Sequence, residues 1–179
     1  MELLVTTQVD FPEVSVDRKP LNLALVIDRS GSMSGAPLEG AKEAARTAVN
    51  MLMPGDWVSV VVFDDQVNVV QRLVRVDRDR SAITRAIAQI HSGGSTNLFG
   101  GWAEGLSQVM ACPKHGVLSR VIMLSDGMAN HGVRDLSQIA QDVGTAAGHG
   151  VTTTSMGLGR QYDEDLLRAV ADAGGGNYV

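Results

Sequence analysis

The residues with the clearest chemical potential follow a short apolar run near the start of the chain. Residues 21–35 read LNLALVIDRSGSMSG, so the run ends at an aspartate and continues into small hydroxyl residues and glycine. Three kinds of site are compatible with Asp28, Ser30 and Ser32 in this order: a catalytic nucleophile, a phosphate-binding loop or a metal site.

Two further segments bring oxygen atoms to positions next to predicted strands or helices. The segment GGSTN, residues 93–97, precedes a predicted helix, and Ser125-Asp126-Gly127 follows the apolar run VIML. In a doubly wound sheet, ligands bind outside the carboxyl ends of the strands, where these segments are expected to meet. Two carboxylates with three hydroxyls, and no histidine or cysteine among them, suit a hard cation such as Mg²⁺.

The elements that position these segments alternate between strand and helix. Short apolar runs rich in β-branched residues predict buried strands at 21–27, 57–63, 117–124 and 151–156. Apolar residues at three-and-four spacing predict helices around 38–52, 83–90, 98–109, 136–143 and 163–173. Residues 67–75 follow the second strand after a short turn and are expected to pair with it antiparallel. The predicted fold class is α/β: a doubly wound, Rossmann-like three-layer sandwich with a mainly parallel sheet, one antiparallel edge strand and helices on both faces.

Composition limits the possible partners and surroundings. The 179-residue chain has a net charge of −5, so it lacks the positive field typical of nucleic-acid-binding proteins. The single cysteine, Cys112, excludes an intramolecular disulfide. The first residues do not form a signal peptide, and no apolar run approaches the roughly 18 residues that span a membrane. We therefore expect a soluble, cytoplasmic protein with no direct membrane insertion and no nucleic-acid partner.

The three oxygen-bearing segments together resemble a known metal site. Asp28-x-Ser30-x-Ser32 after an apolar strand, Thr96 in a glycine loop, and Asp126 in SDG are similar to the metal ion-dependent adhesion site (MIDAS) of von Willebrand factor type A (VWA) domains. The resemblance implies that the two serines and the threonine ligate the metal directly. It implies that the aspartates act mostly through bound waters. The implied ion is Mg²⁺ or Mn²⁺, with Ca²⁺ less suited to a small site.

The resemblance extends over residues 20–179. PGDWVSVVVFDDQV is similar to the family's second strand and hairpin, and RVIMLSDGMAN to its fourth strand. The segment LVIDRSGSMSG is more similar in sequence to bacterial members of the family than to extracellular animal ones. The family's last helix is missing after GGGNYV, so we expect a truncated VWA domain that belongs to a longer chain. Residues 1–19 are expected to form an N-terminal extension or an added edge strand.

The function implied by the resemblance is protein binding without catalysis. In the family the sixth metal position is left for a carboxylate from a partner protein. Ligation mainly by neutral hydroxyls leaves the cation poorly neutralised, so an incoming Asp or Glu is attracted to it. Four residues flank the ligands and are expected to form the partner-binding rim: Arg29, Met33, Asn97 and Met128. A VWA scaffold with a purely structural metal is the alternative within the same fold.

Two enzymatic functions fit the sequence less well than metal-dependent protein binding does. Haloacid dehalogenase-like phosphatases also place an aspartate after the first strand, but they need a second aspartate two residues on, where this chain has Ser30. A hydrolase triad can be drawn through Ser32, Asp126 and His149. However, the local sequence GSMSG has Met33 where a nucleophile elbow requires serine.

Overall fold

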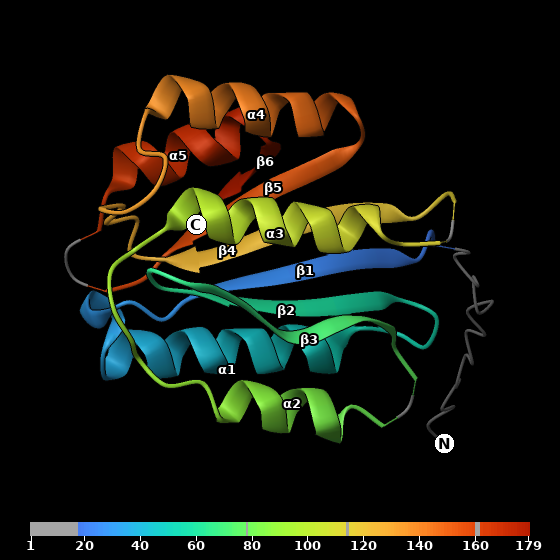
Figure 1. The fold of residues 1–179 in the computed structure, drawn as a ribbon. Helices are drawn as coiled ribbons and strands as arrows, with labels where there is room; N and C mark the ends of the chain where they lie inside the picture. The colour runs from blue at the N-terminus through green and yellow to red at the C-terminus, as the bar shows by residue number, and fades with distance from the viewer. Residues whose placement is uncertain (1–17, 78, 114, 160–161) are drawn as a thin grey trace, which may run out of the picture.

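A single six-stranded sheet with helices on both faces forms the framework of the molecule (Figure 1). The computed structural model describes residues 18–77, 79–113, 115–159 and 162–179. The strands are β1 (Leu21–Asp28), β2 (Trp57–Phe63), β3 (Val67–Arg75), β4 (Leu118–Ser125), β5 (Val151–Gly157) and β6 (Gly175–Tyr178). The helices are the short 3₁₀ turn η1 (Gly31–Met33), α1 (Ala36–Met51), α2 (Ser81–Ala88), α3 (Leu98–Met110), α4 (Leu136–Gly148) and α5 (Glu164–Ala173).

The strand order is β3-β2-β1-β4-β5-β6, and only β3 runs antiparallel to its neighbour. The predicted α/β class, with one antiparallel edge strand on a parallel sheet, is confirmed. β1 lies between β2 and β4, so all but one of its eight residues are buried. The carboxyl ends of β1, β2 and β4 lie side by side, because Asp28 pairs with Phe63 and Ile27 with Leu124.

Two apolar cores cover the two faces of the sheet. One lies under α1 and α2, which pack below the sheet in Figure 1, and it includes Leu25, Ile27, Val49 and Ile87. The other lies under α3, α4 and α5 on the opposite face. Neighbouring residues along β1 point into different cores, since side chains alternate along a strand. This explains why the strand is continuously apolar from Leu23 to Ile27 and does not alternate with polar residues there.

Helix α3 packs closely against the sheet because it carries glycine where it meets the strands. A Cβ added at Gly105 would lie 2.5 Å from a methyl group of Val26, and one at Gly101 would lie 2.4 Å from the Phe63 ring. On the same helix, the Trp102 indole donates to the Thr153 hydroxyl at 3.1 Å. These contacts fix α3, and hence the loop before it, against β1, β2 and β5.

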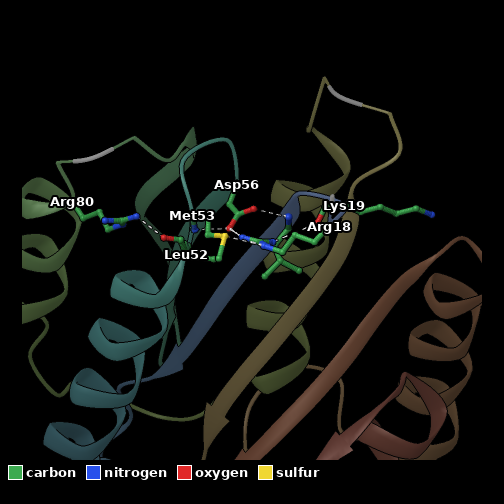
Figure 2. Close-up of polar contacts among 7 residues, drawn as sticks. Arg18, Lys19, Leu52, Met53, Asp56 and Arg80 are labelled. Atoms are coloured by element: carbon green, nitrogen blue, oxygen red, sulfur yellow. Dashed lines mark hydrogen bonds and ion pairs between the residues drawn. The ribbon is translucent and has the colours of Figure 1, made fainter. Parts of the chain in front are cut away.

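A buried carboxylate anchors the start of β1, at the end of the sheet opposite to Asp28 (Figure 2). Asp56 accepts hydrogen bonds from the Arg18 guanidinium at 2.6 Å and from the backbone N–H groups of Met53 at 2.7 Å and Leu21 at 2.9 Å. The side chain is 2% exposed. This clip fixes the point where the chain enters the sheet.

The N-terminal expectation falls mostly outside the described residues, because residues 1–17 are not among them. None of the described helices is both long and apolar enough to cross a membrane.

Candidate metal centre

Asp28, the last residue of β1, is the deepest group of the candidate site. Its Oδ1 accepts a hydrogen bond from the backbone N–H of Ser30 at 2.8 Å, and its Oδ2 accepts one from the Ser125 hydroxyl at 2.6 Å. The Asp28 side chain is completely buried. Both oxygens therefore have a fixed orientation.

The environment of Asp28 disfavours its negative charge. Burial raises the pKa of the Asp28 carboxyl from 3.8 to about 6; hydrogen bonds from Ser125 and Ser30 lower it by less, and repulsion from Asp126 adds to the increase. That repulsion also shows that the Asp126 carboxylate lies close enough to act on Asp28. A bound cation would relieve both effects, since an opposite charge favours the ionised form.

Ser30 and Ser32 lie on the loop that follows β1 and turns into η1. Their hydroxyl oxygens are 3.1 Å apart. Two neighbouring oxygens in an octahedral Mg²⁺ shell lie about 2.9 Å apart, given Mg–O distances near 2.0–2.1 Å. Ser32 is exposed and Ser30 buried. The pair thus has the spacing of two adjacent ligands, and the donor set fits the implied ion.

Thr96 is held by the segment after β4. Its N–H donates to the Asn130 side-chain oxygen at 2.8 Å, and its carbonyl accepts from the N–H groups of Asn130 at 3.2 Å and His131 at 3.0 Å. The neighbouring Asn97 caps α3 by accepting from the Gly100 N–H at 3.0 Å. The Thr96 side chain is buried at this junction.

Asp126 follows β4 directly and completes the set of candidate ligands. Its Oδ1 accepts from the Met128 N–H at 3.1 Å, and its carbonyl accepts from the Asp163 N–H at 2.8 Å. Gly127 next to it has a φ of +73°, and an added Cβ would lie 3.0 Å from the Asp163 carbonyl oxygen. Glycine is therefore required for the sharp turn that leaves Asp126 beside Asp28.

The expected rim residues differ in their accessibility. Met128 is 48% exposed and lies beside Asp126. Met33 is fully buried because η1 turns it into the core under α1, so it is not part of the accessible rim. Arg29 pairs with the Asp64 carboxylate at 3.0 Å, and Asn97 is the half-buried cap of α3.

Three residues at this end of the sheet were given no role of their own from the sequence. Ser125 bonds Asp28 and also accepts from the Gly127 N–H at 2.9 Å; Asn130 holds Thr96; and Asp64 pairs with Arg29. Asp64 directly follows β2, as Asp126 follows β4 and Asp28 ends β1, so its position at the end of a strand could have revealed it. Serine and asparagine in turns carry no comparable pattern.

The geometry separates His149 from the hydrolase triad drawn from the sequence. His149 ends α4 just before β5 begins, at the opposite end of the sheet from Ser32 and Asp126. In the part of the chain that the structure describes, no group of three or more His, Cys, Asp or Glu side chains could hold a metal. A metal at this end of the sheet would therefore depend on hydroxyl ligands.

A family model and several known proteins match most of this chain. The model of the von Willebrand factor type A domain family matches residues 22–179. The chain is 35% identical over 164 residues to the uncharacterized protein sll0103 of Synechocystis sp., covering 89% of this chain and 37% of that protein. It is 30% identical over 159 residues to human inter-alpha-trypsin inhibitor heavy chain H3, covering 85% of this chain and 18% of the relative.

Solved structures share the fold. The structure described as von Willebrand factor type A from Catenulispora acidiphila superposes with a TM-score of 0.78 at 25% identity, covering 89% of this chain and 38% of that one. Proximal thread matrix protein 1 of the mussel byssus, described with a zinc-occupied MIDAS motif, gives a TM-score of 0.68 at 17% identity. The matched region covers 86% of this chain and 41% of that protein. An identity this low supports a shared fold alone.

Proposed function

Because this chain belongs to the von Willebrand factor type A family, we propose that it is a metal-dependent protein-binding module. VWA domains are commonly interaction modules and are generally not enzymes. The observation that carries the proposal is the pairing of the Ser30 and Ser32 hydroxyls at 3.1 Å on a loop whose Ser30 N–H donates to the buried Asp28 carboxylate. The hydrolase triad drawn through Ser32, Asp126 and His149 does not assemble, because His149 lies at the opposite end of the sheet, and we propose no catalytic activity.

Five residues would hold the ion: Asp28, Ser30, Ser32, Thr96 and Asp126. In this proposal the three hydroxyls are direct ligands. The carboxylates orient waters, since both oxygens of Asp28 already accept hydrogen bonds from the protein. A bound Mg²⁺ or Mn²⁺ would supply a concentrated positive charge at the surface, with Ca²⁺ the less suited ion.

The proposed partner is a protein that offers an Asp or Glu side chain to the ion. A largely neutral set of direct ligands leaves net positive charge, and charge pairing is stronger where water is partly excluded. Exposed Met128 beside Asp126 gives this surface an apolar contact next to the charge. Since the chain spans 37% and 18% of two relatives, other domains of a parent protein are part of the proposal. A cytoplasmic setting is proposed from the single cysteine.

The test is calorimetric titration with Mg²⁺ and Mn²⁺. Wild-type protein is expected to bind about one ion per chain, and Asp28→Ala is expected to abolish binding while circular dichroism stays unchanged. Asp172→Ala, which removes an exposed carboxylate at the end of α5, is the matched control and should bind normally. Undiminished binding by Asp28→Ala would rule out the proposed ligands.

The partner chemistry is tested with a random peptide phage library panned in Mg²⁺ and eluted with EDTA. Selected peptides should share an Asp or Glu whose replacement by Asn or Gln abolishes binding. Thr96→Ala should weaken peptide binding more than metal binding, because water can replace the threonine ligand. Peptides that bind equally well in EDTA would indicate a structural metal instead.

A further inference from the structure

Asp64 joins the loops that carry the candidate ligands. Its Oδ2 lies 3.0 Å from the Arg29 guanidinium and accepts the Gly94 N–H at 3.4 Å, while its Oδ1 accepts from the Gln66 N–H at 2.8 Å. The carbonyl of the same residue accepts from the Asn97 N–H at 2.8 Å. The Asp64 side chain is 7% exposed, so this carboxylate is a buried junction and not a surface charge.

The backbone closes the same junction on the other side. The Gly93 N–H donates to the Arg29 carbonyl at 2.6 Å, and the Gly31 N–H donates to the Gly94 carbonyl at 2.9 Å. A Cβ at Gly93 would lie 2.0 Å from the Asp64 carboxylate, so only glycine fits there without displacing it. The loop after β1 and the loop that carries Thr96 are therefore joined directly.

We propose that Arg29, Asp64, Gly93 and Gly94 form a latch that holds Thr96 at a fixed distance from Ser30 and Ser32, and that this rigidity makes the site selective for Mg²⁺ over Ca²⁺. The inference rests on the proposed metal site and assigns positioning roles to residues that do not touch the ion. Mg²⁺ demands near-ideal octahedral geometry at short distances, whereas Ca²⁺ accepts longer and more irregular coordination. A loosened cradle therefore penalises Mg²⁺ more than Ca²⁺.

Asp64→Asn tests the latch because it removes the charge and keeps the shape. We expect Mg²⁺ affinity to fall about tenfold, as is typical when a residue that supports metal ligands is lost. Ca²⁺ affinity should fall less, so that the ratio of the two dissociation constants shifts toward Ca²⁺. Both constants are measured by calorimetry on the same preparation.

Hydrogen exchange in EDTA gives a readout that requires no metal. Amides of residues 93–97 should exchange faster in Asp64→Asn than in wild type, because the Asp64 contacts that hold this loop are weakened. If wild-type protein binds no Mg²⁺, the proposed function fails, and exchange still decides whether the latch orders the loop.

Two further variants distinguish a loss of ligand positioning from a general loss of stability. Arg29→Lys keeps a cation beside Asp64 and should retain more Mg²⁺ affinity than Arg29→Gln. The control is Glu43→Gln, which removes an exposed ion pair to Arg46 on α1 and should change neither affinity nor exchange. Equal loss of Mg²⁺ and Ca²⁺ affinity, or unchanged exchange at residues 93–97 in Asp64→Asn, would overturn the proposal.

Discussion

Asp28 is a carboxylic acid in a fully buried position, with both oxygens accepting hydrogen bonds and a second carboxylate nearby. Its pKa of about 6, against 3.8 in the unfolded chain, means that the metal-free fold binds this proton more tightly than the unfolded chain does. Ionised Asp28 therefore destabilises the metal-free domain by about 3 kcal/mol above pH 6. The destabilisation is relieved as the pH falls from about 6 toward 3.8, where the carboxyl is protonated in the fold.

Asp28→Asn is accordingly expected to stabilise the metal-free domain at pH 7.5 and to abolish metal binding. Unlike an amide at position 56, this amide can keep both contacts, because its oxygen accepts from the Ser30 N–H and the rotatable Ser125 hydroxyl can accept from its NH₂ group. Urea unfolding in EDTA at pH 5.0, 6.0 and 7.5 should show the mutant's advantage over wild type growing with pH, up to about 3 kcal/mol. With saturating Mg²⁺ the order should reverse, because only wild type gains binding energy. A difference between the two proteins that is independent of pH would show that Asp28 is not the titrating group.

The sequence carried much of the information on single residues, but not all of it. Asp28 and Asp126 could be placed because each follows an apolar strand. Ser125 could not, because its role depends on β1 and β4 being neighbours in the sheet, which brings its hydroxyl to 2.6 Å from Asp28. The burial of Met33 was likewise not predictable, since a 3₁₀ turn of three residues decides which way the side chain points.

At the scale of elements, α3 determines where Thr96 lies. The apolar stripe along residues 98–109 predicted this helix and its buried face. The closeness of its packing depends on Gly101 and Gly105, whose missing side chains admit Phe63 and Val26. Periodicity locates a helix but does not give its distance from the sheet, because that distance depends on residues opposite it on other strands.

A pair of glycine substitutions tests this packing. Gly105→Ala is expected to destabilise the domain by about 1–3 kcal/mol, because the added methyl would lie 2.5 Å from Val26 in the core. Gly40→Ala in α1 meets nothing within 4 Å and should stabilise by roughly 0.5–1 kcal/mol, the ordinary gain in a helix. Urea unfolding measures both. Stabilisation by both variants would show that α3 does not rest closely on the sheet.

At the scale of the whole molecule, the sheet separates an anchoring end from the candidate binding end. The Asp56 clip lies at the start of β1 and Asp28 at its end, seven residues further, or about 23 Å at the usual rise of a strand. Burial acts to raise the pKa of Asp56, but hydrogen bonds from Arg18, Leu21 and Met53 outweigh it and leave the pKa below its usual value. This carboxylate therefore stabilises the fold above about pH 4, and the contribution is lost as the pH falls through its lowered pKa.

Asp56→Asn should lower stability without altering metal affinity. The amide replaces one acceptor oxygen with a donor, which leaves a buried N–H or guanidinium group unpaired, at a cost on the order of 2 kcal/mol. Urea unfolding at pH 7.5 measures the loss, and calorimetry with Mg²⁺ should give the wild-type dissociation constant. If Asp56→Asn is fully folded in the titration and still binds Mg²⁺ more weakly than wild type, the two ends of the sheet are coupled.

The central place of β1 also has a consequence during synthesis. Asn22 pairs with Ser119, which the ribosome adds 97 residues later, so one edge of this apolar strand stays unpaired while the intervening chain is made. At roughly 5–20 residues per second that interval is about 5–20 s. We expect a nascent chain with LNLALVI exposed for so long to bind chaperones that recognise extended apolar segments, until β4 has left the exit tunnel and can cover the open edge of β1.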